Sequence, residues 1–584
     1  YKHPELVEEY ATEHDHMGLL YCRQVTCPHC AGDAPLLNSQ WLSREGDRWG
    51  VAIDTDNGKV SFRPYEIVKS RREGSKTYSY GPNGEEIVDQ DKKGTLTKTV
   101  ADGVGQCVHC HQAISSDEIK RQARGESEHG KWKDVLYCVV SIRLEPKLDK
   151  HGTVQRYASG HRKGEIKTQK IRYFRASNET DLKAVQAAER ELEERRLDFE
   201  MLGLVPNEPF PQGNDMRPVN YGMPTWADMF TSRQLLGHLT VMEALQHSKP
   251  KILVEFGEEK GRALITYLQF AIDKIVDYNS RQTRWEYTRG VIKGGFGRHD
   301  FSLKWTFGEM VYAGPSSGFR WGLSQAMDAY KGIEELVAER GVIGLEEGDI
   351  RQLQGSATNM SGVKSHSVDT VVMDPPYYNN VQYSELSDFY YVWQKRTLGD
   401  LYPGWFDHEV TDKALEAVAN PARDGSAKGA KARYEELMQG IFAESKRVLK
   451  PEGIMTLMFT HKSSDAWETL TNALIQSGWD ITACMPVESE SGYSTHQMNM
   501  ASAASTIFIA CRPADRRDRE PSSWAYEVKG KLEAVVREGL GEFERLKLNP
   551  VDRMIASWGR ALRVYSAHWP VQDGDEEVPP TRAM

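Results

Sequence analysis

One stretch decides how this chain folds: Val371-Val372-Met373-Asp374-Pro375-Pro376-Tyr377-Tyr378. The apolar run from Val368 to Met373 predicts a strand, and the two prolines end it by fixing an extended turn. Apolar strands of this kind are buried in parallel sheets, which place their chemistry at the carboxyl ends of the strands. We therefore expect an α/β fold in which Asp374 lies at the functional edge of a sheet.

The residues of this turn suit the recognition of an amino group on a nucleic-acid base. The Asp374 side chain and the carbonyls of Asp374 and Pro375 form a small cage of hydrogen-bond acceptors. Tyr377 offers a flat face on which a base can stack. An enzyme that works on a base must first take it out of the stack. The alternative interpretation is that Asp-Pro-Pro-Tyr is only a turn after a strand.

Length and composition set wide limits on the kind of protein. The chain has 584 residues, 39 % of them hydrophobic, and a net charge of -10. This length predicts two to four domains. We find no apolar run of about 18 residues and no signal peptide, so we expect no membrane partner and a cytoplasmic location. Because residue 1 is Tyr, we expect the natural start to be missing, removed or on a separate piece.

Four of the eight cysteines form two Cys-x-x-Cys pairs, Cys27/Cys30 and Cys107/Cys110. In a large chain without a secretory signal this pattern favours a metal site over disulfides. Each pair has the spacing that lets two thiolates hold one tetrahedral zinc ion, so we predict a zinc ribbon with a long insertion. His29, His109 and His111 are alternative ligands. Two unrelated redox or structural cysteine pairs are the other interpretation.

Basic and aromatic residues alternate in the segment 281–305. Its cations include Arg284, Arg289, Lys293 and Arg298, its aromatic residues include Trp285, Phe296 and Phe301, and four glycines make it flexible. Cations and aromatic rings on a mobile loop suit phosphate contact and base stacking. We therefore predict that these four cations bind nucleic acid, together with Lys462 after the strand at 454–460. The alternative is a loop packed on a neighbouring helix.

Helix and strand patterns alternate from about residue 320. A helix (about 321–340), a strand ending at Glu347-Gly348-Asp349, the Asp374 strand, a helix (about 430–449), a strand (454–460), another helix and two consecutive strands (479–485 and 505–511) follow one another. This order is typical of half of a doubly wound sheet that ends in an antiparallel hairpin. Two helices, about 524–546 and 549–566, close the pattern.

The turn resembles the Asp-Pro-Pro-Tyr motif of the amino-methyltransferases of DNA, which use S-adenosylmethionine. The wider pattern resembles one branch of them, the large adenine-specific methylases with an inserted zinc ribbon (the DUF1156 type). The resemblance covers most of the chain and is strongest at 374–381 and 386–390. Its other segments are the two cysteine pairs, Tyr221-Gly222-Met223, Met229-Phe230-Thr231-Ser232-Arg233-Gln234, Asp277-Tyr278-Asn279-Ser280 and His461-Lys462-Ser463.

The resemblance implies roles for individual residues. Asp374 and the Pro375 carbonyl would accept the two hydrogens of the adenine amino group and aim its lone pair at the methyl group. Pro376 and Tyr377 complete the catalytic set, with Tyr377 stacked on the flipped base. Asp349 would contact the adenine of the cofactor, and the Asp374 turn the reacting methyl. Asp349 as a capping or turn residue is the alternative.

One departure from the family pattern is important. The family has a strand followed by a Gly-rich Phe-x-Gly-x-Gly loop ahead of the zinc ribbon, and we find none here. Gly294-Gly295-Phe296-Gly297 is too basic and lacks a leading strand, and Val254-Glu255-Phe256-Gly257 is followed by charged residues. We therefore expect a Rossmann-like half-sheet whose first strands and glycine loop come from a second polypeptide or from a missing N-terminal segment.

Four domains are expected from this interpretation. They are a zinc ribbon and nucleic-acid recognition insertion (1–180), a helical region with the basic-aromatic loop (181–315), a methyltransferase domain with the Asp-Pro-Pro-Tyr half (316–515), and C-terminal helices with a tail (516–584). The expected substrate is adenine N6 in double-stranded DNA, and the resemblance suggests a prokaryotic modification or antiviral-defence setting. N4 of cytosine, methylation of structured RNA, and a non-catalytic DNA-recognition subunit are the alternatives.

Overall fold

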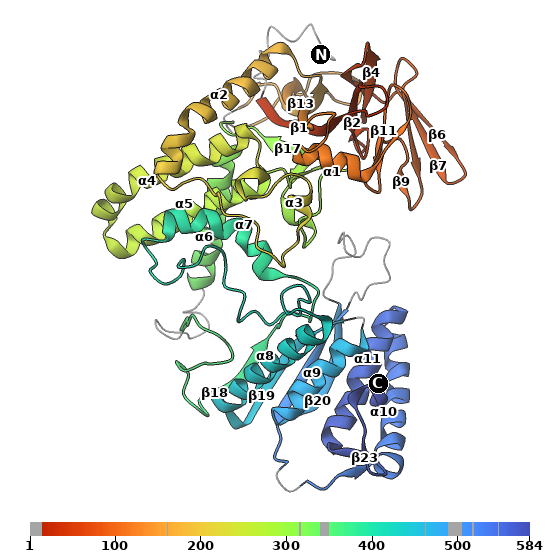
Figure 1. Ribbon diagram of the computed structural model, residues 1–584, viewed down its shortest axis with the longest axis vertical. Coiled ribbons are helices and arrows are strands. Elements are labelled where there is room, and N and C mark those ends of the chain that lie inside the picture. Colours follow the sequence, from red (N-terminus) through yellow and green to blue (C-terminus); the bar gives the residue numbers. More distant parts are fainter. Residues whose placement is uncertain are drawn as a thin grey trace. The chain divides into compact units, whose positions relative to one another are not determined.

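The structure is a computed structural model that describes residues 15–160, 162–314, 317–338, 350–461, 463–488, 505–516, 519–546 and 548–584. It divides into two compact units, which we describe separately (Figure 1). The first unit comprises Tyr1–Pro211, Asp215–Ile343 and Leu386–Thr411, and the second comprises Gln212–Asn214, Gly344–Glu385 and Asp412–Met584. The boundaries expected at residues 180 and 315 fall inside the first unit, and that at 515 inside the second.

An antiparallel sheet forms the centre of the first unit. Strand β1 (Asp15–Thr26) lies between β13 (Lys133–Pro146) and β17 (Thr306–Met310), with β14 (Thr168–Arg175) beside β13 and β2 (Asp33–Leu36) beside β1. The consecutive apolar residues Leu19 to Cys22 are buried on both faces of this sheet. Leu20 and Cys22 belong to one hydrophobic cluster, and Leu19 and Tyr21 to another on the opposite face. Successive side chains of a strand point to opposite faces of the sheet, which explains why neighbouring residues belong to different clusters.

Further short strands follow β2, and all but the last of them lie in the insertion between the cysteine pairs. They are β3 (Trp41–Ser43), β4 (Trp49–Asp56) and β5 (Lys59–Glu66) in one sheet; β6 (Lys69–Glu73), β7 (Lys76–Tyr80), β8 (Glu86–Gln90) and β9 (Gly94–Thr95) in a second; and β10 (Val100–Ala101), β11 (Val104–Gln106) and β12 (Ala113–Ile114) in a third. Helix α1 (Ser116–Arg124) follows, capped by Ser115 and ended by Gly125 at a φ of 73°. The insertion expected between the two cysteine pairs is therefore a set of small antiparallel sheets.

Helices complete the first unit. They are α2 (Glu179–Met201), α3 (Arg217–Asn220), α4 (Ser232–Phe256), α5 (Glu258–Tyr278), α6 (Gly318–Ala338) and the greater part of α7 (Tyr383–Leu398). Capping boxes start α2 at Asn178 and α4 at Thr231. The hairpin of β15 (Arg284–Glu286) and β16 (Val291–Lys293) follows α5. The buried core includes Trp226, Phe230 and Trp393.

A four-stranded mixed sheet organises the second unit, in the order β18 (Val368–Met373), β19 (Leu449–Phe459), β21 (Ser505–Pro513) and β20 (Trp479–Glu488). Strands β18 and β19 are parallel, and the other neighbours are antiparallel. Helices α8 (Ala427–Val448), α9 (Ser464–Gln476), α10 (Lys529–Arg545) and α11 (Pro550–His568) pack with the sheet into one core (Figure 1). The chain ends in β22 (Ser522–Ser523), β23 (Val571–Asp573), β24 (Glu576–Glu577) and α12 (Pro580–Ala583).

One face of this sheet carries the core. Along β19 the side chains of Met455, Leu457 and Phe459 are buried, whereas the intervening residues are only partly buried. Helix α11 approaches β20 closely because Gly559 has no side chain: a Cβ at this position would lie 3.0 Å from Cys484 Cβ. The mixed α/β class and the antiparallel pairing of the last two strands, both expected from the sequence, are confirmed.

The burial expected for the Asp374 strand is wrong in the described part of the chain. Strand β18 lies at the edge of the described sheet, and none of its side chains is fully buried. Val372 is 72 % exposed, and Met485 on β20 is also exposed, at 64 %. An apolar sequence is evidence that a strand needs covering, but the cover has to come from another element. The strand expected before Asp349 lies outside the described residues.

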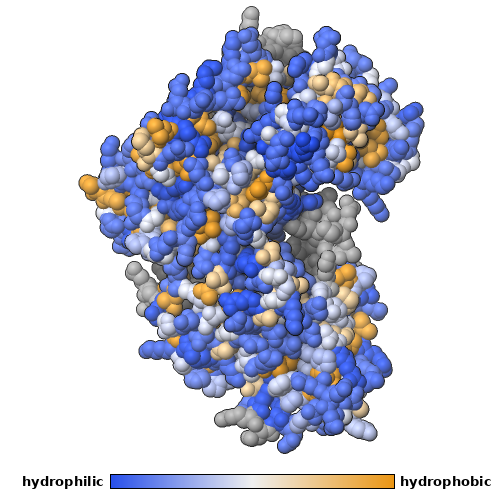
Figure 2. Space-filling model, viewed as in Figure 1, coloured by the Kyte–Doolittle hydropathy of each residue, from blue (hydrophilic) through white to orange (hydrophobic). Residues whose placement is uncertain are grey.

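The visible face of the molecule is mostly polar (Figure 2). Figure 2 shows hydrophilic residues over most of the visible face, with scattered apolar groups between them. No helix among the described residues has the length and apolar character needed to cross a membrane.

Candidate functional site

The turn after β18 is held in one conformation by its own hydrogen bonds. Tyr378 has a φ of 60°, which is uncommon for a residue with a side chain. Its N–H donates to the carbonyl oxygen of Pro376 over 3.0 Å, and its own carbonyl accepts from the N–H of Ala419 over 3.0 Å. A second segment of the chain, at Ala419, therefore stabilises the uncommon backbone conformation of Tyr378.

A buried tyrosine on α8, Tyr434, also stabilises this turn. The Tyr434 hydroxyl donates to the Pro376 carbonyl over 2.9 Å, and its ring lies edge-on to Tyr378 with the centroids 5.2 Å apart. Tyr434 is completely buried, and burial raises its pKa, so its hydroxyl is a donor. The Pro376 carbonyl therefore accepts two hydrogen bonds from the protein, whereas no donor to the Pro375 carbonyl is found among the described residues.

Asp374 follows the last strand residue and is exposed. The Tyr377 hydroxyl donates to Asp374 Oδ1 over 2.6 Å, which orients the carboxylate and leaves Oδ2 for another donor. The ring of Tyr377 is half-buried and lies edge-on to Phe459, with centroids 5.6 Å apart. The sequence predicted a stacking role for Tyr377, and the hydrogen bond to Asp374 is an addition that the sequence did not reveal.

Tyr383 at the start of α7 is a second aromatic residue near Asp374, and the sequence gave no sign of it. Its side chain is 51 % exposed. Burial, followed by the charge of the Asp374 carboxylate, raises the pKa of Tyr383. This exposed ring is a second candidate for stacking against a base.

His461 lies on the other side of the turn, at the end of β19. Its Nδ1 accepts from the N–H of Ser463 over 3.0 Å, which places the proton of the neutral ring on Nε2. Nε2 lies 3.3 Å from Asn379 Oδ1, and the ring is edge-on to Tyr378. His461 is thus brought to the Asp374 turn, as its position after a neighbouring strand suggested. The predicted contacts of Lys462 and Asp349 lie outside the described residues.

The loop at 412–426 braces the start of α7 next to the turn. The Glu416 carboxylate accepts from the Ser384 N–H over 2.7 Å and pairs with Arg423 at 2.8 Å. Its neighbour Ala419 donates to the Tyr378 carbonyl, as described above. Nothing in the local sequence of this loop indicated the contact, because the two segments are about 40 residues apart.

The two cysteine pairs meet in the first unit. The four Sγ atoms lie within 4.8 Å of one another, with Cys27 and Cys110, and likewise Cys30 and Cys107, 3.7 Å apart. A tetrahedron with metal–sulfur distances of about 2.3 Å has sulfur–sulfur distances of about 3.8 Å. The four cysteines could therefore hold a metal ion, and their geometry is compatible with zinc.

The two pairs have matching backbones. The N–H of Cys27 donates to the Gly32 carbonyl and that of Ala31 to the Cys27 carbonyl; Cys107 with Gln112, and His111 with Cys107, repeat this pattern. The residues that follow the second cysteines, Ala31 and His111, have φ values of 58° and 60°.

The environment of the thiols differs within the cluster. Burial raises the pKa of Cys27 to about 12, whereas a backbone hydrogen bond with Gln112 lowers that of Cys110 to about 7. Among the histidines considered as ligands, His29 lies 3.1 Å from the Ala113 carbonyl, and the metal-binding group comprises only the cysteines.

The segment 281–305 is packed, and the stacking predicted for its aromatic residues is wrong. Phe301 is buried, Trp285 is buried with its Nε1 donating to the Leu42 carbonyl over 2.7 Å, and Phe296 packs edge-on to Phe389 on α7. Asp277 on α5 accepts from the Gly295 N–H over 2.8 Å. The alternative of a loop packed on neighbouring helices therefore describes this segment, whose rings fill the core.

The four cations of this segment differ in their surroundings. Arg284 pairs with Glu286 at 3.2 Å, and Lys293 lies 3.9 Å from the same carboxylate. Arg289 and Arg298 are exposed. Only these two of the four predicted nucleic-acid contacts are therefore presented to solvent without a carboxylate in an ion pair among the described residues.

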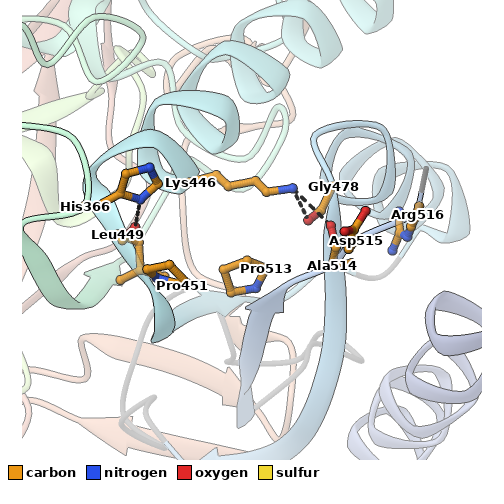
Figure 3. Close-up of a pocket in the computed structure, with 9 residues that line it drawn as sticks. All are labelled: His366, Lys446, Leu449, Pro451, Gly478, Pro513, Ala514, Asp515 and Arg516. Atoms are coloured by element: carbon orange, nitrogen blue, oxygen red, sulfur yellow. Dashed lines mark hydrogen bonds between the residues drawn. The ribbon is translucent and has the colours of Figure 1, made fainter. Parts of the chain in front are cut away.

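A cavity of about 640 Å³ lies at the opposite end of β18 and β19 from Asp374 (Figure 3). His366, Leu449 and Pro451 line it where the parallel strands begin. Lys446 Nζ donates to the carbonyls of Gly478 and Ala514 over 3.0 and 3.1 Å. This cavity is thus separate from the turn, and its lysine supports the backbone.

No protein-family model, curated protein or solved structure matches this chain.

Proposed function

We propose that this chain is the part of a DNA amino-methyltransferase that recognises and activates the target base, with adenine N6 as the acceptor. The observation that carries the proposal is the turn at 374–378. Asp374 is exposed and Pro375 is buried. Among the described residues, neither Asp374 Oδ2 nor the Pro375 carbonyl receives a hydrogen bond, and an exocyclic amino group has two hydrogens to donate. Tyr377 and Tyr383 add aromatic rings beside them.

The chemistry of the step assigns a role to each residue. When bound, S-adenosylmethionine would supply the methyl group of a sulfonium: the acceptor nitrogen would bond to the methyl carbon as the carbon–sulfur bond breaks, S-adenosylhomocysteine would leave as a neutral thioether, and one N–H proton would pass through the exposed Asp374 carboxylate to solvent. Accepting both amino hydrogens localises the nitrogen lone pair and aims it, so the chain contributes mainly alignment. Asp374 accepts one hydrogen and the Pro375 carbonyl the other. Tyr434 and Ala419 keep the turn from relaxing toward an unstrained conformation.

A further segment is proposed to complete the sheet beside β18. Edge strands of parallel sheets are normally covered, and an exposed apolar edge favours aggregation. The position of β18 at the edge of the described sheet supports a covering segment, which would carry the Gly-rich loop and the acid that binds the cofactor ribose. We propose that a second polypeptide, or further sequence of the same protein, supplies it.

The cysteine cluster is proposed to bind one zinc ion with a structural role. All four ligand positions are cysteines, which matches closed structural sites and leaves no position for a substrate. Zinc would fix the ribbon that joins β2, β11 and α1 of the first unit.

The test is methyl transfer to DNA. The full chain is incubated with tritiated S-adenosylmethionine and duplex DNA, alone and with the candidate covering polypeptide, and the modified base is identified by mass spectrometry. N6-methyladenine that disappears with Asp374→Ala supports the proposal. N4-methylcytosine, or methylated RNA in a parallel reaction, would move the substrate to one of the alternatives. No methylation in any combination would contradict the proposal.

A further inference from the structure

A small cavity in the first unit gathers hydrogen-bond donors at the beginning of a long helix. It encloses about 300 Å³ between β1, β13, α2 and the N-terminal turn of α4. Tyr21, Lys133, Ser232, Arg233 and Arg281 contribute side chains to its lining. None of these residues has a part in the proposed methyl transfer, and the cavity belongs wholly to one unit.

The N-terminus of α4 supplies backbone donors. This helix has 25 residues, and its cap residue Thr231 accepts from the Gln234 N–H. The N–H groups of Ser232 and Arg233 precede the first intrahelical hydrogen bond, which runs from the Leu235 N–H to the Thr231 carbonyl. These two groups and the positive end of the helix dipole favour an anion at this place.

Tyr21 gives an independent indication that a ligand binds here. Its side chain is 3 % exposed, and its hydroxyl has no hydrogen-bond partner among the described residues. The ring is fixed by stacking on Phe307, with centroids 5.2 Å apart and planes at 9°. Burial raises the pKa of Tyr21 well above its usual range, so the hydroxyl remains a donor. A buried donor without a partner is costly unless a ligand or water accepts from it.

The lining of the cavity carries three cations, Lys133, Arg233 and Arg281, against the carboxylates of Asp134 and Glu189. Asp134 is shared by two guanidinium groups, Arg281 and the buried Arg23. After burial, the Glu309 carboxylate is the next cause that raises the pKa of Tyr21. Arg233 uses its Nε for Glu309 at 2.7 Å, and Lys133 is exposed at the start of β13. Glu189 on α2 is an acid in the lining and would oppose an anion.

We infer that this cavity binds a phosphate group, held by the Tyr21 hydroxyl, the N-terminus of α4 and the side chains of Lys133 and Arg233. A tetrahedral oxyanion accepts from several donors at once, which matches the convergence of a hydroxyl, backbone N–H groups and cations. The phosphate can be free or part of a nucleic acid, and the volume suits one phosphate with its ester oxygens. The inference does not depend on methyl transfer.

The direct test is isothermal titration calorimetry of the full chain with inorganic phosphate, against sodium chloride at equal ionic strength. We expect saturable binding of one phosphate. Tyr21→Phe should weaken it about 5-fold, the loss of one hydrogen bond. Lys133→Glu should weaken it at least 10-fold, and Glu189→Gln should tighten it. Lys133 and Glu189 are exposed, so their variants do not depend on a repacked core.

Matched controls separate the cavity from general effects. Tyr137→Phe removes a hydroxyl from an equally buried tyrosine outside the cavity, and Lys76→Glu reverses an exposed lysine on β7. Both should bind phosphate like the unmodified chain. Absence of saturable binding, or equal losses in the controls and the cavity variants, would overturn the inference.

The source of the phosphate is resolved by competition. If the site takes a nucleic-acid phosphate, inorganic phosphate should displace a labelled duplex, and Lys133→Glu should weaken the duplex as well as phosphate. A 5′-phosphorylated oligonucleotide that outcompetes its hydroxyl-terminated counterpart would assign a terminal phosphate. Displacement of neither would assign free phosphate. Methylation is not measured, so failure of the proposed enzymatic function and failure of this inference give different results.

Discussion

The cysteine cluster and the Asp374 turn are both small sites on tight turns, yet they are held in different ways. Each cysteine pair lies on a local backbone motif that closes within six residues, from Cys27 to Gly32 and from Cys107 to Gln112. The Asp374 turn instead depends on Tyr434 and Ala419, which are more than 40 residues away. Each cysteine pair can therefore be recognised from local spacing, although the fold brings the two pairs together across 77 to 83 residues. The conformation of the Asp374 turn itself depends on distant parts of the fold.

The largest expected effect comes from removing one ligand of the cysteine cluster. Cys107→Ala should abolish zinc binding, because zinc binding by structural sites is worth about 10–16 kcal/mol and is coupled to folding. We expect loss of zinc by elemental analysis and loss of amide protection in β10 to β12 and α1, with the second unit unchanged. Cys138→Ala, a buried cysteine outside the cluster, is the control. Retention of stoichiometric zinc in Cys107→Ala would show that these residues do not form the site.

The second prediction concerns the Asp374 turn, where the substitution Asp374→Ala removes the proposed hydrogen-bond acceptor. Asp374→Ala should lower methyl transfer by about 10²–10⁴-fold, the range of a positioned acid or base. Its thermal unfolding should stay close to that of the unmodified chain, since Asp374 is exposed. Single-turnover methylation and differential scanning calorimetry measure the two effects. Activity within a few-fold of the unmodified chain would contradict the role of the turn.

The third prediction distinguishes the two possible uses of Tyr377. Tyr377→Phe keeps the ring and loses the hydrogen bond to Asp374, so we expect a decrease in rate of about 2- to 10-fold. Tyr377→Ala also removes the ring and should lose about 1–3 kcal/mol of stacking with the base. Equal rates for the two variants would mean that the ring does not contact the base, which would direct attention to Tyr383.

The fourth prediction tests whether the hydrogen bond from Tyr434 stabilises the Asp374 turn. Tyr434→Phe removes the hydroxyl that donates to the Pro376 carbonyl, at a cost of about 1 kcal/mol. We expect a fall in kcat with KM for DNA unchanged, because the turn loosens while the binding surface remains. Tyr565→Phe is the matched control, since its hydroxyl donates to the Val578 carbonyl in another part of the unit. A similar fall in kcat for both variants would indicate general destabilisation.

The smallest expected effect concerns the surface cations. Replacing Arg289 and Arg298 by Gln should reduce the dependence of DNA binding on salt by about two phosphate contacts. Arg284→Gln is the control, because Arg284 is paired with Glu286. Fluorescence anisotropy with labelled duplex between low and moderate salt measures the slope. If Arg284→Gln reduced the salt dependence of DNA binding more than the double variant does, the assignment of Arg289 and Arg298 as the phosphate contacts would be wrong.

The sequence predicted correctly the features that have a clear local pattern. The cysteine spacing predicted four thiols in one place, and alternating patterns predicted the mixed α/β class and the pairing of β20 with β21. It failed for the aromatic residues of 281–305, because a hydrophobic ring looks the same in sequence whether it faces a base or a core. Phe301 is buried because Phe210 and Trp226 pack against it. Trp285 is buried between Phe174 of β14 and the Leu42 carbonyl of β3.

The sequence by itself determined two local motifs: the Asp-Pro-Pro-Tyr turn ends a strand, and paired cysteines form knuckles, because prolines and short loops limit the backbone locally. Only the tertiary structure decided what surrounds those residues. It placed the Tyr377 hydroxyl on Asp374, Tyr434 under Pro376 and Tyr21 in a cavity at the start of α4, and it left Val372 exposed on an edge strand. The physical reason is that hydrogen bonds and burial depend on neighbours in space, and these lie tens to hundreds of residues away along the chain.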